Sequence, residues 1–262
     1  MGQHLSIWEH MAQSPATSQP ITIKHVNSVV RRGVAALLWR TLAPNYCMLC
    51  ALPATAAVCT DCEVALPALS SNCCAHCAEP LTAPAAHCGR CLAHPPAFDA
   101  TLAMWRYQAP IDTLVHALKY RHQLAIARWF GAALATRCLQ TPLPTVDRLF
   151  AVPLSATRLA ERGFNQSLEV ARTVSRQTGV RIDLALRRIR DTNTQADLPW
   201  KARAANVRQA FACDTRLDGL HVLVIDDVMT TGATLNEVAL ALKSAGAARV
   251  NNLVVARTPR QA

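Results

Sequence analysis

The stretch of this sequence best suited to chemistry joins two adjacent acidic residues to a threonine-rich turn. Asp226 and Asp227 follow the apolar run 222–225. The turn comes next and consists of Val228, Met229, Thr230, Thr231, Gly232, Ala233 and Thr234. Backbone N–H groups in such a turn, and the positive end of a helix that begins there, bind anions. Gly232 lets a ligand approach the backbone closely.

The two carboxylates are unsuited to a phosphate beside them, because like charges repel. They suit hydroxyl groups or a cation, so a sugar phosphate fits both halves of the stretch. The alternative is purely structural: the aspartates end a strand and cap a helix, and Thr-Gly is ordinary turn chemistry. Capping requires neither both acids nor the additional threonines. A Walker-type nucleotide loop is excluded, because its Gly-Lys-Thr core is absent.

A second group of residues has the spacing of metal ligands. Four Cys-x-x-Cys pairs occur, formed by Cys47 and Cys50, Cys59 and Cys62, Cys74 and Cys77, and Cys88 and Cys91. Two such pairs complete one tetrahedral Zn²⁺ site, so the eight thiolates predict two structural zinc ions. An oxidised or redox-active role is the alternative.

The pairing of the cysteine pairs stays open at this stage. Neighbouring pairs share an ion or the pairs interleave, and a module with one zinc, using Cys73, His76 or His87 as substitute ligands, is also open. Cys138 and Cys213 lie outside this region and are expected to be buried apolar residues.

Composition limits the partners and the compartment. A formal charge of +10 and a pI near 9.4 favour partners that carry phosphate, either nucleic acid or a phosphorylated metabolite, although a merely basic surface is the simpler alternative. No apolar run of about 20 residues is present, and no signal peptide is recognisable. We therefore expect a cytoplasmic protein without membrane insertion. In such a reducing compartment the eleven cysteines are not expected to form a disulfide scaffold.

The chain of 262 residues divides by composition into three parts. Residues 1–44 are expected to form a weakly ordered tail with a short helix, 45–97 a cysteine-rich zinc module, and 98–262 an α/β domain. In the last part, strands are expected near 98–107, 148–153, 222–225 and 250–255. Helices are expected from Asp112 as cap, over 124–139, over 165–178 with Gly179 as left-handed cap, and from about Leu235 to a stop at Gly246. This alternation predicts a parallel sheet with crossover helices.

Several motifs resemble a known family. The two acids and the T-G-x-T turn resemble the phosphoribosyl pyrophosphate (PRPP) binding motif of type I phosphoribosyltransferases. Val152-Pro153-Leu154, Arg158-Leu159, the stretch 161–166 and Leu118-Lys119-Tyr120 look like the signature of the ComF family (competence protein F). The resemblance covers about 46–259. It implies an α/β fold, with a parallel sheet and flanking helices like those of type I phosphoribosyltransferases, plus a small N-terminal zinc-binding module.

The resemblance also implies roles for individual residues. Asp226 and Asp227 would be catalytic and orient the sugar, and the turn 228–234 would hold its phosphate. Arg158 and Arg162 would clamp the pyrophosphate, with Mg²⁺ shielding its charge. Further PRPP contacts would come from Asn165, Gln166, Lys119 and Tyr120. For Asn165 and its neighbours, the alternative is that they begin a helix on an exposed face.

Two functions remain open. One is an enzyme, a pentosyl-transferring glycosyltransferase that displaces pyrophosphate from PRPP. The other is a non-catalytic PRPP or nucleotide sensor and DNA-binding adaptor, with single-stranded DNA and competence proteins as candidate partners in DNA uptake and transformation. Relatives that use 6-oxopurines commonly have an aspartate at the place of Thr230, so hypoxanthine and guanine are not expected as acceptors. The basic stretch 187–208, which includes Trp200, could be a lid, a nucleic-acid contact or a solvated charge run.

Overall fold

The computed structural model of the protein describes residues 45–141, 145–190 and 207–259. The expected tail and helix at 1–44 lie outside the described residues. So do residues 191–206, which make up most of the basic stretch and include Trp200.

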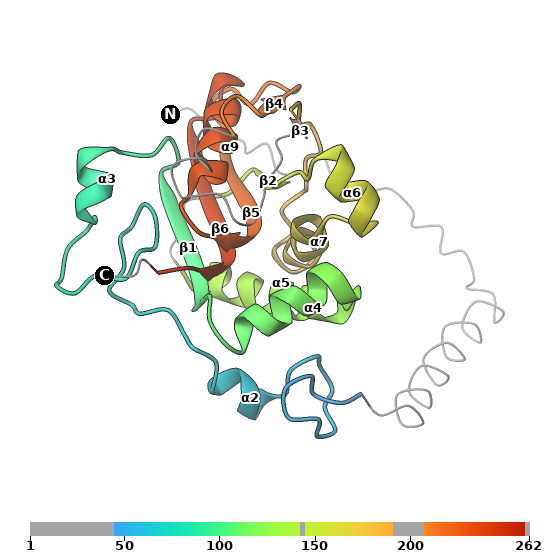
Figure 1. Ribbon diagram of the computed structural model, residues 1–262. Coiled ribbons are helices and arrows are strands. Elements are labelled where there is room, and N and C mark those ends of the chain that lie inside the picture. Colours follow the sequence, from blue (N-terminus) through green and yellow to red (C-terminus); the bar gives the residue numbers. More distant parts are fainter. Residues whose placement is uncertain (1–44, 142–144, 191–206, 260–262) are drawn as a thin grey trace, which may run out of the picture. The chain divides into compact units, whose positions relative to one another are not determined.

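A four-stranded parallel sheet forms the centre of the described chain (Figure 1). Its strands, in spatial order, are β1 (Ala100–Arg106), β6 (Arg249–Arg257), β5 (His221–Met229) and β2 (Arg148–Ala151). β5 and β6 are buried along most of their length, as strands covered on both faces must be. The expected parallel α/β sheet is therefore confirmed.

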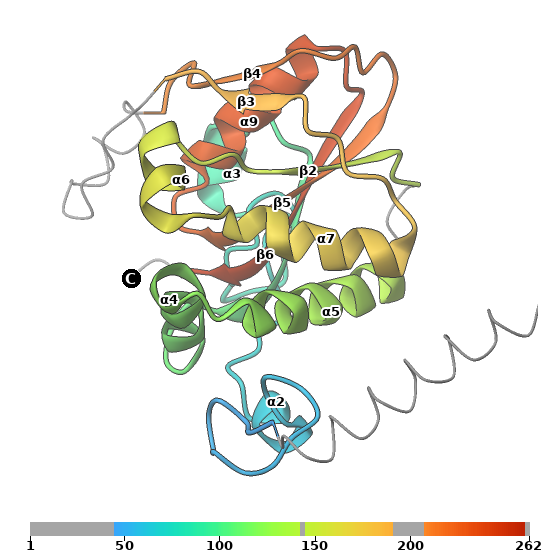
Figure 2. The ribbon, with the colours of Figure 1, turned by 90° about the vertical axis from the view of Figure 1, so that its right-hand side faces the viewer.

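Helices cover both faces of this sheet (Figure 2). One face packs against α4 (Ile111–Arg121), α5 (Leu124–Gln140) and α7 (Gln166–Thr178). The other face packs against α9 (Ala233–Ser244). The short α6 (Ala156–Arg162) follows β2, and an antiparallel pair is formed by β3 (Leu186–Arg188) and β4 (Phe211–Cys213).

Helix boundaries follow local chemistry. The expected helix over 165–178 is confirmed, since the Asn165 side chain accepts hydrogen bonds from the N–H groups of Ser167 and Leu168, and Gly179 has a φ of 76°. The expected cap at Asp112 is wrong. α4 begins at Ile111 after Pro110, so Asp112 lies inside the first turn, where its negative charge still favours the helix dipole.

β5 is longer than its apolar run predicts. The strand was expected to end at Ile225, but it continues to Met229 because β6 keeps pairing with it, with Asp226 opposite Val254 and Val228 opposite Ala256. On its other edge β5 pairs with β2 only as far as Ile225. The two acids therefore lie where β5 has one neighbour instead of two, the kind of place at which open α/β sheets bind ligands.

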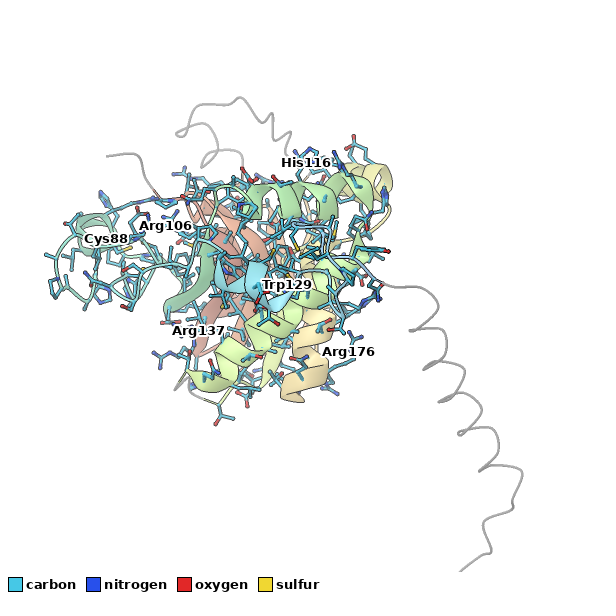
Figure 3. All side chains as sticks on the ribbon, turned by 90° about the horizontal axis from the view of Figure 1, so that it is seen from below. Cys88, Arg106, His116, Trp129, Arg137 and Arg176 are labelled. Carbon is cyan, nitrogen blue, oxygen red and sulfur yellow. The ribbon has the colours of Figure 1, made fainter. Side chains whose placement is uncertain are left out.

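The cysteine-rich segment forms two small modules around two short helices, α2 (Thr60–Val64) and α3 (Gly89–Ala93). Cys47, Val58 and Leu66 of the first module join the core beside α5, where the Trp129 Nε1–H donates a hydrogen bond to Glu63 at 3.3 Å. Cys74, Cys77 and Cys91 of the second module join the other core, beside α9. Cys88 and Trp129 accordingly lie well apart in Figure 3.

The tightest helix contact is the one between α5 and α7. A Cβ atom added at Gly131 of α5 would lie 2.6 Å from the Thr173 Cβ and 2.7 Å from the Val170 carbonyl oxygen. Neither atom can rotate away, because one is backbone and the other is fixed to it. Gly131 therefore sets how closely α7, which carries residues of the candidate site, packs against α5.

We predict that Gly131→Ala destabilises the protein by about 1–3 kcal/mol, because overpacking outweighs the gain in helix propensity. Chemical denaturation measures this change. Gly89→Ala in α3 is the matched control, since its added Cβ would meet nothing within 4 Å. Equal stability of the two variants would contradict the assigned packing.

Candidate functional site

The two adjacent acids are buried and hold partners within the protein. Asp226 is 9% exposed and Asp227 is 5% exposed. The Asp226 Oδ1 accepts hydrogen bonds from the Ser167 hydroxyl at 3.0 Å and from the Asp227 N–H at 2.9 Å. Asp227 forms an ion pair with Lys119, whose Nζ lies 2.5 Å from its Oδ2. Beyond Ile225, where β5 no longer pairs with β2, these side-chain contacts take the place of hydrogen bonds between the two strands.

The two acids carry different charge. Burial, followed by the nearby charge of Asp227, raises the pKa of Asp226 to about 7. Burial alone would also raise the pKa of Asp227, but the charge and hydrogen bond of Lys119 lower it below its ordinary value. Asp227 is therefore ionised at neutral pH, while Asp226 is close to half protonated. The ionised Asp227 can accept a strong hydrogen bond, and Asp226 can take up or release a proton near neutral pH.

The threonine-rich turn lies directly after these acids. Gly232 has a φ of 80° and caps α9, and Thr230 is exposed. Among the described residues, no backbone acceptor pairs with the N–H groups of Thr230, Thr231, Gly232 or Thr234. The turn also borders a cavity of about 310 Å³ that it shares with the second cysteine module. Open N–H groups at the positive end of a helix can bind a phosphate.

A basic cavity of about 260 Å³ lies between α4 and α6. Its lining consists of Lys119, Tyr120, His122, Arg158, Glu161 and Arg162. Four of these were singled out from the sequence, and the fold brings them together. Because Lys119 also pairs with Asp227, the basic cavity borders the acidic pair.

Arg162 is the most unusual residue of this cavity. It is only 8% exposed, and its Nη1 donates a hydrogen bond to the Gln166 Oε1 at 2.5 Å. Its guanidinium carbon lies 5.4 Å from the centre of the Tyr120 ring. In the described part of the chain, no carboxylate lies within ion-pair distance of it. A buried cation without a counter-ion is poised to bind an anion.

Asn165 and Gln166 use their side chains inside the protein. Asn165 caps α7 and donates from Nδ2 to the Val152 carbonyl oxygen at 3.0 Å. Gln166 is buried and orients Arg162. Their direct contact with a ligand stays a prediction.

Sequence reasoning missed two sets of contacts. Ser167, the partner of Asp226, gave no signal beyond its place in the first turn of a helix. Arg257 at the end of β6 and Arg90 in α3 donate hydrogen bonds to carbonyls of the threonine-rich turn. These contacts join residues 27 to 141 positions apart, and such separations leave no local pattern in the sequence.

Neighbouring cysteine pairs come together in two separate clusters. The ligand atoms of Cys47, Cys50, Cys59 and Cys62 lie within 4.8 Å of one another, and so do those of Cys74, Cys77, Cys88 and Cys91. The rings of His76 and His87 lie 4.2 Å apart at an angle of 43° to each other, and neither residue belongs to a cluster. Cys138 and Cys213 are half-buried rather than fully buried, each at the margin of a core.

The thiols within each cluster are electrostatically unequal. Burial raises the pKa of Cys47 and Cys74, yet backbone N–H donors outweigh it and lower both values to about 6. Hydrogen bonds from Cys59 and Cys50 raise the pKa of Cys62 to about 12. Four crowded sulfurs resist full ionisation unless a cation offsets their charge. The donor set, four thiols at tetrahedral spacing with N–H groups on one sulfur, fits Zn²⁺.

Comparison with known proteins identifies the class. Residues 137–262 match the phosphoribosyl transferase domain family model. DNA utilization protein YhgH of Salmonella typhi is 35% identical over 226 residues, covering 82% of this chain and 98% of that protein. Competence protein F of Haemophilus influenzae is 31% identical over 194 residues, covering 70% and 84%. The chain carries a phosphoribosyltransferase-type domain. It belongs to the ComF family, the family of these two proteins.

Solved structures give weaker matches. A glutamine PRPP amidotransferase from B. subtilis is 22% identical with a TM-score of 0.35, and the match covers 49% of this chain and 25% of that one. TT1426 from Thermus thermophilus is 18% identical with a TM-score of 0.32, covering 52% and 85%. Across the described ranges, no helix combines the length and apolarity needed to span a membrane.

The raised pKa of Asp226 predicts a pH-dependent stability. The folded protein binds this proton more tightly than the unfolded chain, so the stabilisation is complete below the ordinary aspartate pKa and is lost as pH rises through about 7. Relative to Asp226→Asn, the wild type should lose about 2 kcal/mol between about pH 5.5 and pH 7.

Denaturant titrations with zinc in excess measure this difference. Asp214→Asn is the control, because a hydrogen bond from Arg187 lowers the pKa of this exposed acid and places its titration below the range tested. Parallel pH curves for the wild type and Asp226→Asn would mean that the acid is not held neutral by the fold.

Proposed function

We propose that this protein binds PRPP at the carboxyl end of β5 and transfers its phosphoribosyl group, in a role linked to DNA utilisation. One observation carries the proposal: Lys119 lies both in the basic cavity and against Asp227. The acids therefore separate two anion-attracting regions, the basic cavity and the threonine-rich turn. A ligand with phosphate at both ends of a sugar has this pattern of charge, and PRPP is such a ligand.

The turn at 230–234 binds the 5′-phosphate in this proposal. Its open N–H groups and the α9 dipole favour a dianion, and the hydroxyls of Thr230, Thr231 and Thr234 add donors. Asp226 and Asp227 accept hydrogen bonds from the ring hydroxyls. Arg162 and Arg158 receive the pyrophosphate, whose negative charge grows as it leaves.

Binding requires an exchange of partners at Lys119. In the structure its ammonium group is held by Asp227, which leaves little of that carboxylate exposed. A pyrophosphate in the basic cavity offers the ammonium group stronger partners, so Lys119 turns to it and frees Asp227 for the sugar. Ligand binding and unmasking of the acid are thus one event, which disfavours occupation by a sugar without pyrophosphate.

Magnesium belongs to this proposal as a companion of PRPP. In the described ranges, the groups with metal-ligand spacing are the two cysteine clusters, so Mg²⁺ would be held chiefly by the pyrophosphate oxygens. Asp227, which stays ionised, is the protein carboxylate best suited to assist. The ion shields the charge of the leaving group.

The acceptor of the phosphoribosyl group is a nucleophile of unknown class. Thr230 lacks a basic side chain, and this argues against 6-oxopurines, as the family resemblance implies. The relatives named for DNA utilisation and competence support a role with DNA, and the net charge of +10 suits a nucleic-acid partner.

A second candidate function is a sensor without catalysis, in which bound PRPP or a nucleotide controls contact with single-stranded DNA. The ion pair between Asp227 and Lys119 favours this sensor role, because ligand binding alone would break the pair without any chemical reaction. Salt-dependent DNA affinity that persists when both aspartates are replaced by alanine supports this alternative. Release of pyrophosphate from PRPP in the presence of an acceptor supports the enzyme.

We further propose that the module at 45–97 holds two structural zinc ions and supports the phosphoribosyltransferase-like domain at 98–262. Both modules are small and contribute few core residues, so they require a cross-link to hold their shape. Each ion would bind four thiolates, which leaves no open position for a substrate.

We expect PRPP with Mg²⁺ to bind to the wild type in isothermal titration calorimetry. Arg162→Gln should weaken binding by about tenfold to a hundredfold, because it removes a charge-assisted contact to the pyrophosphate. Arg137→Gln is the control, since this exposed arginine in the last turn of α5 precedes β2 and so lies at the amino end of the sheet (Figure 3). The absence of binding heat in the wild type would refute the proposed ligand.

Metal analysis tests the zinc proposal. We expect about two zinc ions per chain, and about one after Cys59→Ser or Cys88→Ser, because each substitution removes one of four ligands. The two residues form a matched pair, as both are half-buried and both cap a short helix. A zinc content that neither substitution changes would contradict the two-site assignment.

A further inference from the structure

Three consecutive carbonyl groups at the threonine-rich turn are held from one side by arginines. The Arg257 Nη1 donates hydrogen bonds to the carbonyl oxygens of Met229 at 3.3 Å and Thr230 at 2.6 Å. The Arg90 Nη1 donates to the carbonyl oxygen of Thr231 at 3.2 Å. Arg257 is only 1% exposed, so its charge is committed to these contacts.

Holding these carbonyls fixes the direction of the N–H groups. In a trans peptide, the C=O and the N–H of the same unit point in opposite directions. Fixing the carbonyls of residues 229, 230 and 231 therefore turns the N–H groups of Thr230, Thr231 and Gly232 away from the arginines. These are the N–H groups that lack a backbone acceptor among the described residues. The arginines thus prepare the anion-binding face of the turn before a ligand arrives.

Both arginines depend on the second cysteine module. The Arg257 Nε donates to the carbonyl oxygen of Cys77 at 2.9 Å, and its Nη2 forms an ion pair with Glu79 at 2.5 Å. Arg90 lies in α3, between Cys88 and Cys91. The supports of the turn therefore all begin in the segment that the thiols of the second cluster gather into one place.

Within the described ranges, the first cysteine module donates no hydrogen bond to the turn. It packs against the opposite core, where Glu63 bonds to Trp129 of α5. The two modules have the same set of four thiols and a similar size. A difference between their effects on the turn would therefore come from where each module contacts the rest of the fold.

We infer that Arg257 and Arg90 are positioning residues of the phosphate-binding turn, and that a metal ion in the Cys74, Cys77, Cys88 and Cys91 cluster controls the shape of this turn through them. The identity of the phosphate ligand rests on the proposed function, but the coupling between cluster and turn does not. The second module is therefore a structural regulator of the site, while the first is an independent attachment.

Hydrogen exchange of the ligand-free, zinc-loaded, full-length protein tests the positioning role. The protected amides bonded to the turn are those of Ala233, which donates to the Thr231 hydroxyl, and Asn236, which donates to the Gly232 carbonyl oxygen. Glu79→Gln and Arg90→Gln should speed exchange at Ala233 and Asn236 by about tenfold, because each loses a charge-assisted hydrogen bond behind the turn. Arg257→Lys should do the same, and it keeps the charge if larger changes prevent folding. Glu63→Gln, the matched change at the first module, should leave the turn unchanged.

Two results would overturn the positioning role. One is unchanged exchange at Ala233 and Asn236 in both Glu79→Gln and Arg90→Gln. The other is an increase that is as large in the core of β5 at 222–225 as in the turn, since that would reflect general loosening of the fold.

The metal coupling is tested with the matched pair Cys88→Ser and Cys59→Ser. Exchange at Ala233 and Asn236 should rise in Cys88→Ser and not in Cys59→Ser, and PRPP affinity in calorimetry should fall by about tenfold in Cys88→Ser alone. Equal effects of the two substitutions on turn exchange would refute the coupling. If the wild type binds no PRPP, the proposed function fails, while the exchange data still decide whether cluster and turn are coupled.

Discussion

The candidate site depends on one mismatch in the sheet, the continuation of β5 for four residues past the last residue paired with β2. Beyond Ile225, the strand has a neighbour on one edge alone, and the acids at 226 and 227 occupy this position. Their carboxylates bond to the N–H groups that follow them, to Ser167 and to Lys119. Burial and the charge of Asp227 raise the pKa of Asp226 to about 7, while Lys119 lowers the pKa of Asp227 and keeps it ionised. The charge pattern of the site follows from where β2 stops.

The surrounding elements adjust this arrangement from three directions. α4 brings Lys119 to Asp227, α6 brings Arg162 to the same cavity, and the second cysteine module reaches the turn through Arg257 and Arg90. The sheet therefore supplies the acids and the turn, while the added elements supply positive charge. In the proposed function a phosphorylated sugar contacts all of these groups, and the phosphoribosyltransferase-type domain of the chain supports that proposal.

Much of the fold could be predicted because its signals are local. The apolar run 222–225 and the helix positions Leu235, Val238, Ala239 and Leu242 are buried as expected, and the cysteine spacing anticipated two four-thiol clusters. The end of β5 could not be predicted, because it depends on pairing with β6. The masking of Asp227 by Lys119 and the contact of Arg257 with Cys77, 180 residues away, are tertiary effects without a sequence period.

The central claim is that a single sugar phosphate occupies the acids and the turn together, displacing Lys119 from Asp227. A crystal structure of the protein with PRPP and Mg²⁺ tests it most directly. We expect the 5′-phosphate on the N–H groups of Thr231 and Gly232, the ribose hydroxyls on the two aspartates, and the Lys119 ammonium group on the pyrophosphate. PRPP bound elsewhere, with the Lys119 and Asp227 ion pair intact, would contradict it.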